Sequence, residues 1–240
     1  MFEQSKFLYY LFWAFGFIGV FLLAFFTCKK FGIKRKQVAI IVPAVYIPVV
    51  AWMFFLYWAE SGFTHFGGNN IVRIFIWVPL FAWPVAKILK IDFKQMVNFL
   101  APLPCAVHGI SHFGCIFEGC CYGYPTEYFT IWNPALHEYR FAIQPIEATV
   151  AILIIAFIII YDRQKQYSRD ANAYPLMLIL FGSTRFAMEF MRDNEKLFWG
   201  ISNLAIHAFV MFVVGLVWLL IVWIIRKKKA KQTPPDAIAE

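Results

Sequence analysis

The sequence predicts an all-α, polytopic helical membrane protein, and three observations lead to this prediction. Of the 240 residues, 61% are hydrophobic and 15% are charged, whereas a soluble domain is roughly 45–50% apolar and about 25% charged. The apolar residues fall into runs of roughly 20, the length of a helix that crosses a bilayer. The basic residues gather in alternate loops between those runs. A soluble globular domain, a disordered chain and a disulfide-rich secreted module are therefore excluded.

Seven apolar runs are predicted to be transmembrane helices, at residues 7–28, 38–58, 71–89, 95–112, 142–161, 173–191 and 201–225. The first run lacks a small-residue cleavage site and is followed by Lys29 and Lys30, which indicates a retained helix and not a removed signal peptide. The fourth and sixth runs are the weakest, because both contain glycines and ionisable residues. We expect one transmembrane domain at 1–231, with an external segment at 113–141 and a disordered tail at 232–240.

The distribution of basic residues predicts the orientation of the chain. Of the 22 Lys and Arg residues, 16 follow the first, third, fifth and seventh runs. Because basic loops stay in the cytoplasm, the N-terminus is predicted to be outside and the C-terminus cytoplasmic. The stretch 226–231 then faces the inner leaflet, whose anionic lipids attract it. The net charge of +8 thus reports orientation, and no nucleic-acid partner is predicted.

Polar and ionisable residues in four of the predicted spans fall at one depth, near the external surface. They are Arg73, His108, His112, Gln144, Glu147, Arg185, Glu189 and Arg192. Arg185, Glu189 and Arg192 are spaced i, i+4 and i+7, so they share one helix face. Ionisable groups inside a membrane are costly, which makes this set a functional candidate. We expect the side chains to line one cavity; the alternative is a set of salt bridges that only hold the bundle together.

A segment rich in glycine and cysteine follows the two histidines. Residues 114–123 contain three glycines and three cysteines, so a regular lipid-facing helix is not expected there. Three interpretations of Cys115, Cys120 and Cys121 stay open. The first interpretation is a disulfide. The second is a metal site that includes the two histidines, whose i, i+4 spacing suits a metal. The third is that the cysteines are packing residues around a site made by other groups.

Three segments of the chain carry a family resemblance. They read Gly-Cys-Ile-Phe-Glu-Gly-Cys-Cys-Tyr-Gly at 114–123, Phe-Ala-Ile-Gln-Pro-Ile-Glu-Ala at 141–148 and Phe-Gly-Ser-Thr-Arg-Phe-Ala-Met-Glu-Phe-Met-Arg-Asp at 181–193. In this order they resemble signature segments of bacterial prolipoprotein diacylglyceryl transferases. Gly67 and Gly68 resemble the glycine pair that opens the third span of that family. The resemblance covers roughly residues 60–220.

The resemblance implies a multi-pass enzyme of the bacterial inner membrane. Members of the family move the diacylglyceryl group of phosphatidylglycerol onto a cysteine thiol of a prolipoprotein, and glycerol phosphate leaves. The implied partners are the bilayer, a phosphatidylglycerol-like phospholipid and a protein or small-molecule acceptor. No cofactor and no metal are implied.

The resemblance and the spacing together suggest roles for individual residues. His108, His112, Arg185 and Glu189 are expected to be catalytic, with a histidine as the base for the acceptor thiol and Arg185 as the donor to the lipid phosphate. The residues expected to bind substrate are Arg73, Gly114, Glu118, Gly119, Gly123, Gln144, Glu147 and Arg192.

The chain departs from the family pattern at four positions, one of which is Phe66, where the family has a histidine before the glycine pair. Where the family has its signature arginine, asparagine and glutamate, this sequence has His112, Cys115 and Cys120. Two further interpretations therefore stay open. One is a relative that binds lipid or transfers a phospholipid-derived group to a different acceptor. The other is a membrane thiol–disulfide oxidoreductase that uses Cys115, Cys120 and Cys121.

Overall fold

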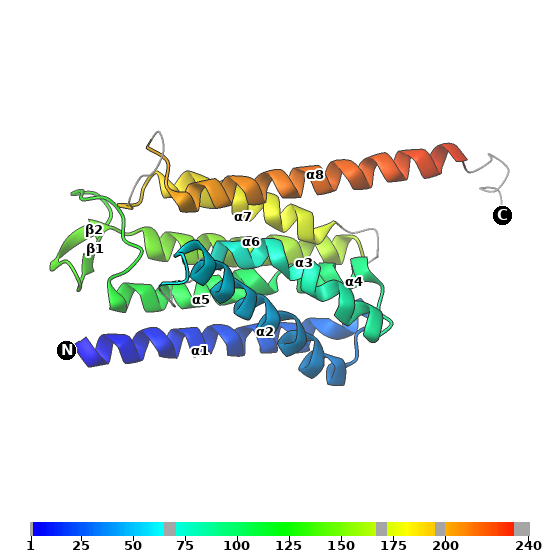
Figure 1. Ribbon diagram of the computed structural model, residues 1–240, viewed down its shortest axis with the longest axis horizontal. Coiled ribbons are helices and arrows are strands. Elements are labelled where there is room, and N and C mark those ends of the chain that lie inside the picture. The colour runs from blue at the N-terminus through cyan, green and yellow to red at the C-terminus, as the bar shows by residue number, and fades with distance from the viewer. Residues whose placement is uncertain (1, 65–70, 167–171, 195–199, 233–240) are drawn as a thin grey trace.

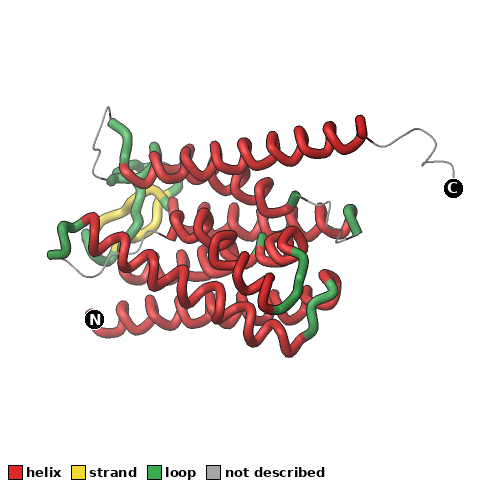
Figure 2. Tube along the Cα trace, turned by 45° about the vertical axis from the view of Figure 1, so that its right-hand side comes forward, coloured by secondary structure: helices red, strands yellow, loops and turns green. Residues whose placement is uncertain are grey.

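The computed structural model describes residues 2–64, 71–166, 172–194 and 200–232. Long helices lie side by side in a bundle, and a small hairpin of two strands closes one end of it (Figure 1, Figure 2). The prediction of a mostly helical chain is confirmed. The predicted disordered tail, beyond Gln232, and the glycine pair at 67–68 lie outside the described residues.

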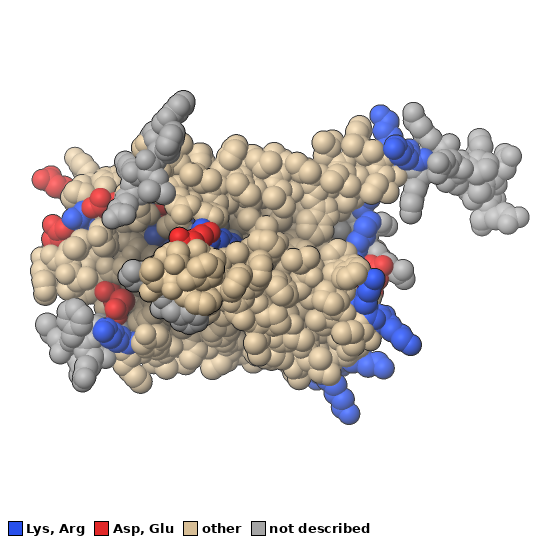
Figure 3. All heavy atoms as spheres, viewed as in Figure 1, with Lys and Arg blue, Asp and Glu red and all other residues tan. Residues whose placement is uncertain are grey.

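The described elements follow one another along the chain without a large insertion. They are α1 (Phe2–Thr27), the 3-10 helix η1 (Cys28–Phe31), α2 (Arg35–Glu60), α3 (Ile71–Ile88), α4 (Phe93–Leu100), α5 (Leu103–Glu118), β1 (Thr130–Asn133), β2 (Glu138–Phe141), α6 (Ile143–Gln164), α7 (Ala173–Glu189) and α8 (Asn203–Gln232). Lys and Arg side chains gather at the end of the bundle where α8 finishes, here called the basic end (Figure 3). The opposite end, which carries β1 and β2, is called the hairpin end (Figure 1).

Five helical stretches in the described part of the chain are long and apolar enough to cross a membrane. They are Lys6–Phe31, Arg35–Glu60, Phe93–Glu118, Ile143–Gln164 and Asn203–Lys228. The other two predicted spans correspond to α3 and α7, which have 18 and 17 residues and lie among the longer helices (Figure 1). Large apolar side chains such as Phe26, Ile47 and Leu153 are exposed on the bundle, as expected where lipid covers a helix.

The fourth predicted span, 95–112, differs from the structure at both its middle and its end. The chain breaks between α4 and α5 at Ala101 and Pro102, because proline lacks an N–H and its ring clashes with the preceding turn. The helix then continues to Glu118, past the predicted end at residue 112. It stops at Gly119, whose φ of 74° forms a left-handed cap that glycine adopts without strain.

The first half of the glycine- and cysteine-rich segment is helical, but it does not face lipid, in agreement with the expectation for residues 114–123. Gly114 faces α1 so closely that a Cβ atom there would meet Phe12 Cβ and the Tyr9 carbonyl at 3.0 Å. This last part of α5 is therefore packed against another helix instead of lipid, and glycine allows the close approach.

The hairpin of β1 and β2 is an element that the sequence reading did not predict. Its strands are antiparallel and pair Thr130 with Phe141 and Asn133 with Glu138. Four-residue strands carry too short an alternation of polar and apolar residues to stand out from a loop. The predicted external segment 113–141 thus contains the end of α5, a loop and this hairpin.

Helix α7 is held close against α8 by two glycines. A Cβ atom on Gly182 would lie 2.7 Å from the backbone nitrogen of Phe212, and one on Gly215 would lie 2.8 Å from the carbonyl oxygen of Pro175. Small residues at such crossings let two backbones approach within a membrane. The contact fixes the position of α7, which carries the arginine-rich motif.

Candidate functional site

Two arginines and two glutamates form a buried charge network near the hairpin end of the bundle. Arg185 and Glu189 lie on α7, Arg192 follows that helix, and Glu147 lies on α6. All four are at most 5% exposed. Arg185 and Glu189 share one face of α7, as the spacing predicts. The predicted i+7 position is wrong for Arg192, because α7 ends at Glu189 and Arg192 reaches the network from the segment after the helix.

Each glutamate of the network bridges both arginines. Nη1 of Arg185 donates to Oε1 of Glu147, and Nη2 of Arg192 donates to the other oxygen of that carboxylate. Glu189 Oε1 lies 2.5 Å from Nη2 of Arg185 and 3.4 Å from Nε of Arg192. Two positive and two negative groups balance, which is the condition for keeping charges in an apolar interior.

Two residues that hold Glu189 were not predicted. Its Oε2 atom accepts hydrogen bonds from Ser202 Oγ at 2.7 Å and from Asn194 Nδ2 at 2.9 Å. Both donors stand between α7 and α8, where no helical spacing relates them to the motif. Only the fold brings them together, so the sequence carries no signal that could have identified them.

The two histidines of α5 lie beside this network. Nδ1 of His112 is 3.2 Å from Oε2 of Glu147, and the rings of His108 and His112 are 4.2 Å apart between centroids. Phe181 packs edge-on against His108 at 4.8 Å. Among the described residues, Nδ1 of His108 has no hydrogen-bond partner. One histidine is thus next to the carboxylate, and the other keeps a ring nitrogen free.

Two pockets reach the network from different sides. The first, here called the lateral pocket, is a narrow pocket between α5, α6 and α7; it is lined by His108, Glu147, Val150, Phe181, Thr184, Arg185 and Met188. The second, the end pocket, is also narrow and is lined by Glu189, Phe190, Arg192, Asn194, Gly200, Ile201, Ser202 and Ala205. The four charged groups are therefore shared between two pockets, with Glu147 and Arg185 in the lining of one and Glu189 and Arg192 in the lining of the other.

The loop after α5 is attached to the network through backbone contacts. Gln144 Nε2 donates to the carbonyl oxygen of Cys120 at 3.0 Å, and Gly123 forms an isolated β-bridge with Arg192. A Cβ atom on Gly123 would lie 2.7 Å from Phe141, and one on Gly119 would lie 2.6 Å from Asn133 Oδ1. In the structure, these two predicted substrate-binding glycines permit close packing of the loop.

Two other predicted substrate-binding residues lie apart from the network. Arg73 is paired with Glu60 of α2 at 2.6 Å. Glu118 is at the end of α5, and among the described residues it has no ion pair with either arginine of the network. Acidic and basic side chains also lie next to one another in the middle of the otherwise apolar face of the bundle (Figure 3). Neither residue is brought to the two pockets, so their predicted roles have no geometric support here.

The three cysteines of the segment converge on one point. Their Sγ atoms all lie within 4.8 Å of one another, and each is a free thiol. The histidines belong to a different group, with Glu147, so the predicted joint site of cysteine and histidine ligands is not formed. Hydrogen bonds from Cys115 and Cys120 hold the pKa of the Cys121 thiol well below its usual value, and Arg192 and His112 act in the same direction against the effect of burial.

These features define a class of protein: a helical membrane protein that buries guanidinium, carboxylate and imidazole groups together within its bundle. The family model for prolipoprotein diacylglyceryl transferase matches residues 6–222. The chain therefore belongs to that family, whose members are membrane transferases of lipoprotein biosynthesis. A search of curated proteins found no match to the chain. The matched range contains the charge network, both histidines and the three cysteines.

Proposed function

We propose that this protein transfers the diacylglyceryl group of a phosphatidylglycerol-like lipid to a thiol acceptor, a prolipoprotein cysteine, at the outer leaflet of the bacterial inner membrane. The observation that carries the proposal is that Arg185 belongs to the charge network and also lines the lateral pocket. Family membership supplies the reaction class, and the geometry of this chain supports the assignment of residues to steps.

The reaction asks for a phosphate donor and a base. The acceptor thiolate attacks the glycerol carbon, a C–S bond forms, and the C–O bond to phosphate breaks so that glycerol phosphate leaves. Arg185 suits the phosphate because a guanidinium donates two parallel hydrogen bonds, and its Nε atom has no hydrogen-bond partner among the described residues. The thiol proton passes to His108, whose ring nitrogen is free in the same pocket.

The lateral pocket suits a lipid that arrives from the membrane. Val150, Phe181 and Met188 form apolar walls of the pocket, and Arg185 and His108 line it as well. A lipid can then keep its chains along α6 and α7 while its phosphate meets the arginine. The pocket is narrow in this structure, so we expect α6 and α7 to separate when a lipid binds.

The end pocket suits the acceptor. It is lined by Glu189 and Arg192, and a peptide thiol that enters here passes the charge network to reach the glycerol carbon and His108 in the lateral pocket. This division requires the hairpin end to face outside. We propose seven membrane crossings, with α3 and α7 as the two short ones, the N-terminus outside and the C-terminus cytoplasmic. The basic end, where Lys and Arg gather (Figure 3), is then cytoplasmic.

A second candidate is transfer of the same lipid group to a different acceptor. The observation in its favour is local: His112, Cys115 and Cys120 replace residues of the family pattern, and all three adjoin the loop after α5. The arginine motif and Glu147 match the family pattern, so the donor lipid stays the same in this proposal and the acceptor changes.

The test is a transfer assay with purified protein in vesicles that contain phosphatidylglycerol labelled in its diacylglyceryl group, with a lipobox peptide as the acceptor. We expect a thioether-linked product, and Arg185→Lys is expected to lower the rate by about 100-fold or more, because a lysine replaces a bidentate donor with a point charge. Arg140→Lys is the matched control, since Arg140 pairs with Glu138 and Asp193 at the surface.

The outcomes separate the candidates. Labelled lipid that disappears without peptide product, and reappears on another molecule in a total lipid extract, selects the second candidate. An Arg185→Lys protein that remains folded and keeps the full rate contradicts the role of Arg185 in both.

A further inference from the structure

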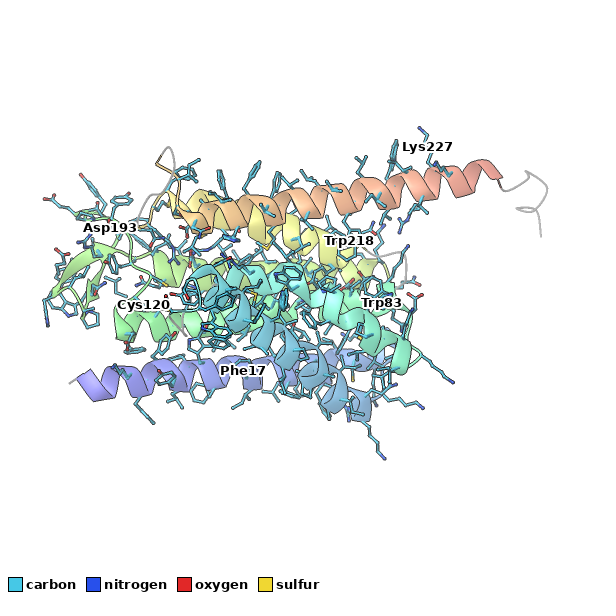
Figure 4. All side chains as sticks on the ribbon, viewed as in Figure 1. Phe17, Trp83, Cys120, Asp193, Trp218 and Lys227 are labelled. Atoms are coloured by element: carbon cyan, nitrogen blue, oxygen red, sulfur yellow. The ribbon has the colours of Figure 1, made fainter. Side chains whose placement is uncertain are left out.

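Cys115, Cys120 and Cys121 form a compact group of donors that the transfer reaction does not use. Cys115 lies in the last turn of α5, and the other two follow directly after Gly119. Figure 4 shows Cys120 toward the end of the bundle that carries Asp193 and away from Lys227. The backbone turns sharply to bring the thiols together, since both Gly119 and Cys121 have positive φ angles, 74° and 58°. Such a conformation is uncommon for a residue other than glycine.

The spacing of the three sulfur atoms fits a shared ion better than a covalent bond. A disulfide places its sulfur atoms about 2 Å apart, and each of these cysteines is free. Three thiolates that bind one ion at about 2.3 Å each would stand roughly 4 Å from one another. The Sγ atoms here all lie within 4.8 Å of each other, so small side-chain movements suffice to close the group around an ion.

The surroundings hold the three donors in place. Asn133 Nδ2 donates to the Gly119 carbonyl at 3.1 Å, and Gln144 Nε2 donates to the Cys120 carbonyl at 3.0 Å. Gly123, two residues after Cys121, forms an isolated β-bridge with Arg192, which fixes the far end of the loop that carries Cys120 and Cys121. Contacts of this kind around a metal site orient its ligands and tune its affinity.

The other group of metal-ligand residues, His108, His112 and Glu147, does not suit a cation. Both oxygens of Glu147 already accept hydrogen bonds from arginines, and two guanidinium groups at this distance repel a positive ion. The cysteine group differs in its chemistry, because all three of its donors are soft sulfur atoms. Thiolates alone select soft ions such as Cu(I), whereas structural Zn(II) takes four ligands.

We propose that Cys115, Cys120 and Cys121 form a three-sulfur site for a soft metal ion, with Cu(I) as the best match. Three S–metal bonds form, and the thiol protons are released to solvent. The ion would join the end of α5 to the loop that bridges to Arg192 through Gly123. It would therefore brace the edge of the site without touching the lipid.

The test is an anaerobic titration of the reduced full-length protein in detergent with Cu(I), in competition with a chromophoric Cu(I) chelator. We expect one Cu(I) per chain. We expect Cys115→Ser, Cys120→Ser and Cys121→Ser each to weaken binding by more than about tenfold. Cys28→Ser and Cys105→Ser are the matched controls, because these two cysteines are buried elsewhere in the bundle, and they are expected to bind as the parent does.

A second measurement keeps the proposal testable if the Cys115 variant fails to fold. Bound Cu(I) is expected to protect three of the five cysteines of the parent protein from maleimide, as counted by mass. Three results would overturn the proposal: no binding, equal loss in the control variants, or a disulfide within the group in protein alkylated directly from cells. None of these readouts uses transferase activity, so their failure leaves the proposed function standing.

Discussion

Glu147 is the residue on which both arginines of the network depend. Its two oxygens accept from Arg185 and Arg192, and its neighbour His112 lies 3.2 Å away. The spacing of polar residues already placed Glu147, Arg185 and Glu189 at one depth of the membrane. The bridging of two guanidinium groups by one carboxylate was not predictable, because the pairing depends on how α6 lies against α7.

We predict that Glu147→Gln destabilises the protein more than any surface charge change. Removing one partner of a buried ion pair leaves uncompensated charge and typically costs about 3–5 kcal/mol. Glu138→Gln is the control: Glu138 also pairs with an arginine, but its side chain is 46% exposed, and exposed pairs contribute about 1 kcal/mol or less. Unfolding of both variants in detergent, followed by circular dichroism, measures the difference; equal stability would show that the network adds little.

We predict that His108→Gln lowers the transfer rate by about 100-fold, the usual contribution of a general base, while the protein stays folded. His108 is buried in the lateral pocket with a free ring nitrogen. His137→Gln, in the exposed hairpin turn, is expected to leave the rate unchanged. The measurement is the rate of thioether formation. If His112→Gln causes the larger loss instead, the base is the histidine beside Glu147.

At the scale of elements, the pairing of α6 with α7 decides how the site opens. The lateral pocket runs between them, whereas α7 and α8 are locked by Gly182 and Gly215. The break between α4 and α5, the extension of α5 to Glu118 and the hairpin all lie at positions where helical periodicity is short or interrupted. Proline accounts for the break between α4 and α5, and glycine accounts for the end of α5. The hairpin is stabilised by contacts between residues that are distant in sequence.

We predict that Thr184→Trp blocks transfer, because an indole fills the lateral pocket between α6 and α7. Ser183→Trp is the matched control: both hydroxyl groups hydrogen-bond the Leu180 carbonyl, but Ser183 is exposed and does not line the pocket. The expected result is a loss of about tenfold or more in the rate of the first variant, the order of the effect that misplacing a substrate has on a reaction. Equal rates in both variants would place lipid access elsewhere.

At the scale of the whole molecule, charge separates the two ends of the bundle. Basic side chains gather where α8 finishes, and acidic and basic ones mix at the hairpin end (Figure 3). The net charge of +8 therefore comes from basic side chains that gather at one end of the bundle. This asymmetry supports one orientation of the whole bundle in the membrane, with the basic end in the cytoplasm, because basic loops stay on the cytoplasmic side.

We predict that Glu127→Cys is labelled by an impermeant maleimide on intact cells, and that Lys36→Cys is labelled only after the membrane is permeabilised. Both positions are exposed, one near the hairpin and one at the start of α2 at the basic end. Labelling of the unsubstituted chain is the baseline, since Cys120 and Cys121 are partly exposed. The reverse pattern would invert the orientation and move the site to the inner leaflet.

Sequence alone was sufficient to predict a helical membrane protein and the helix face that carries Arg185 and Glu189. Composition and periodicity are local properties, so they can be read without a fold. The contacts between elements became known from the fold: Glu147 bridges two arginines, and Ser202 and Asn194 hold Glu189. The three thiols form one group, and the two histidines form a separate group with Glu147. Those contacts join residues from different elements, and their distances depend on how the helices pack.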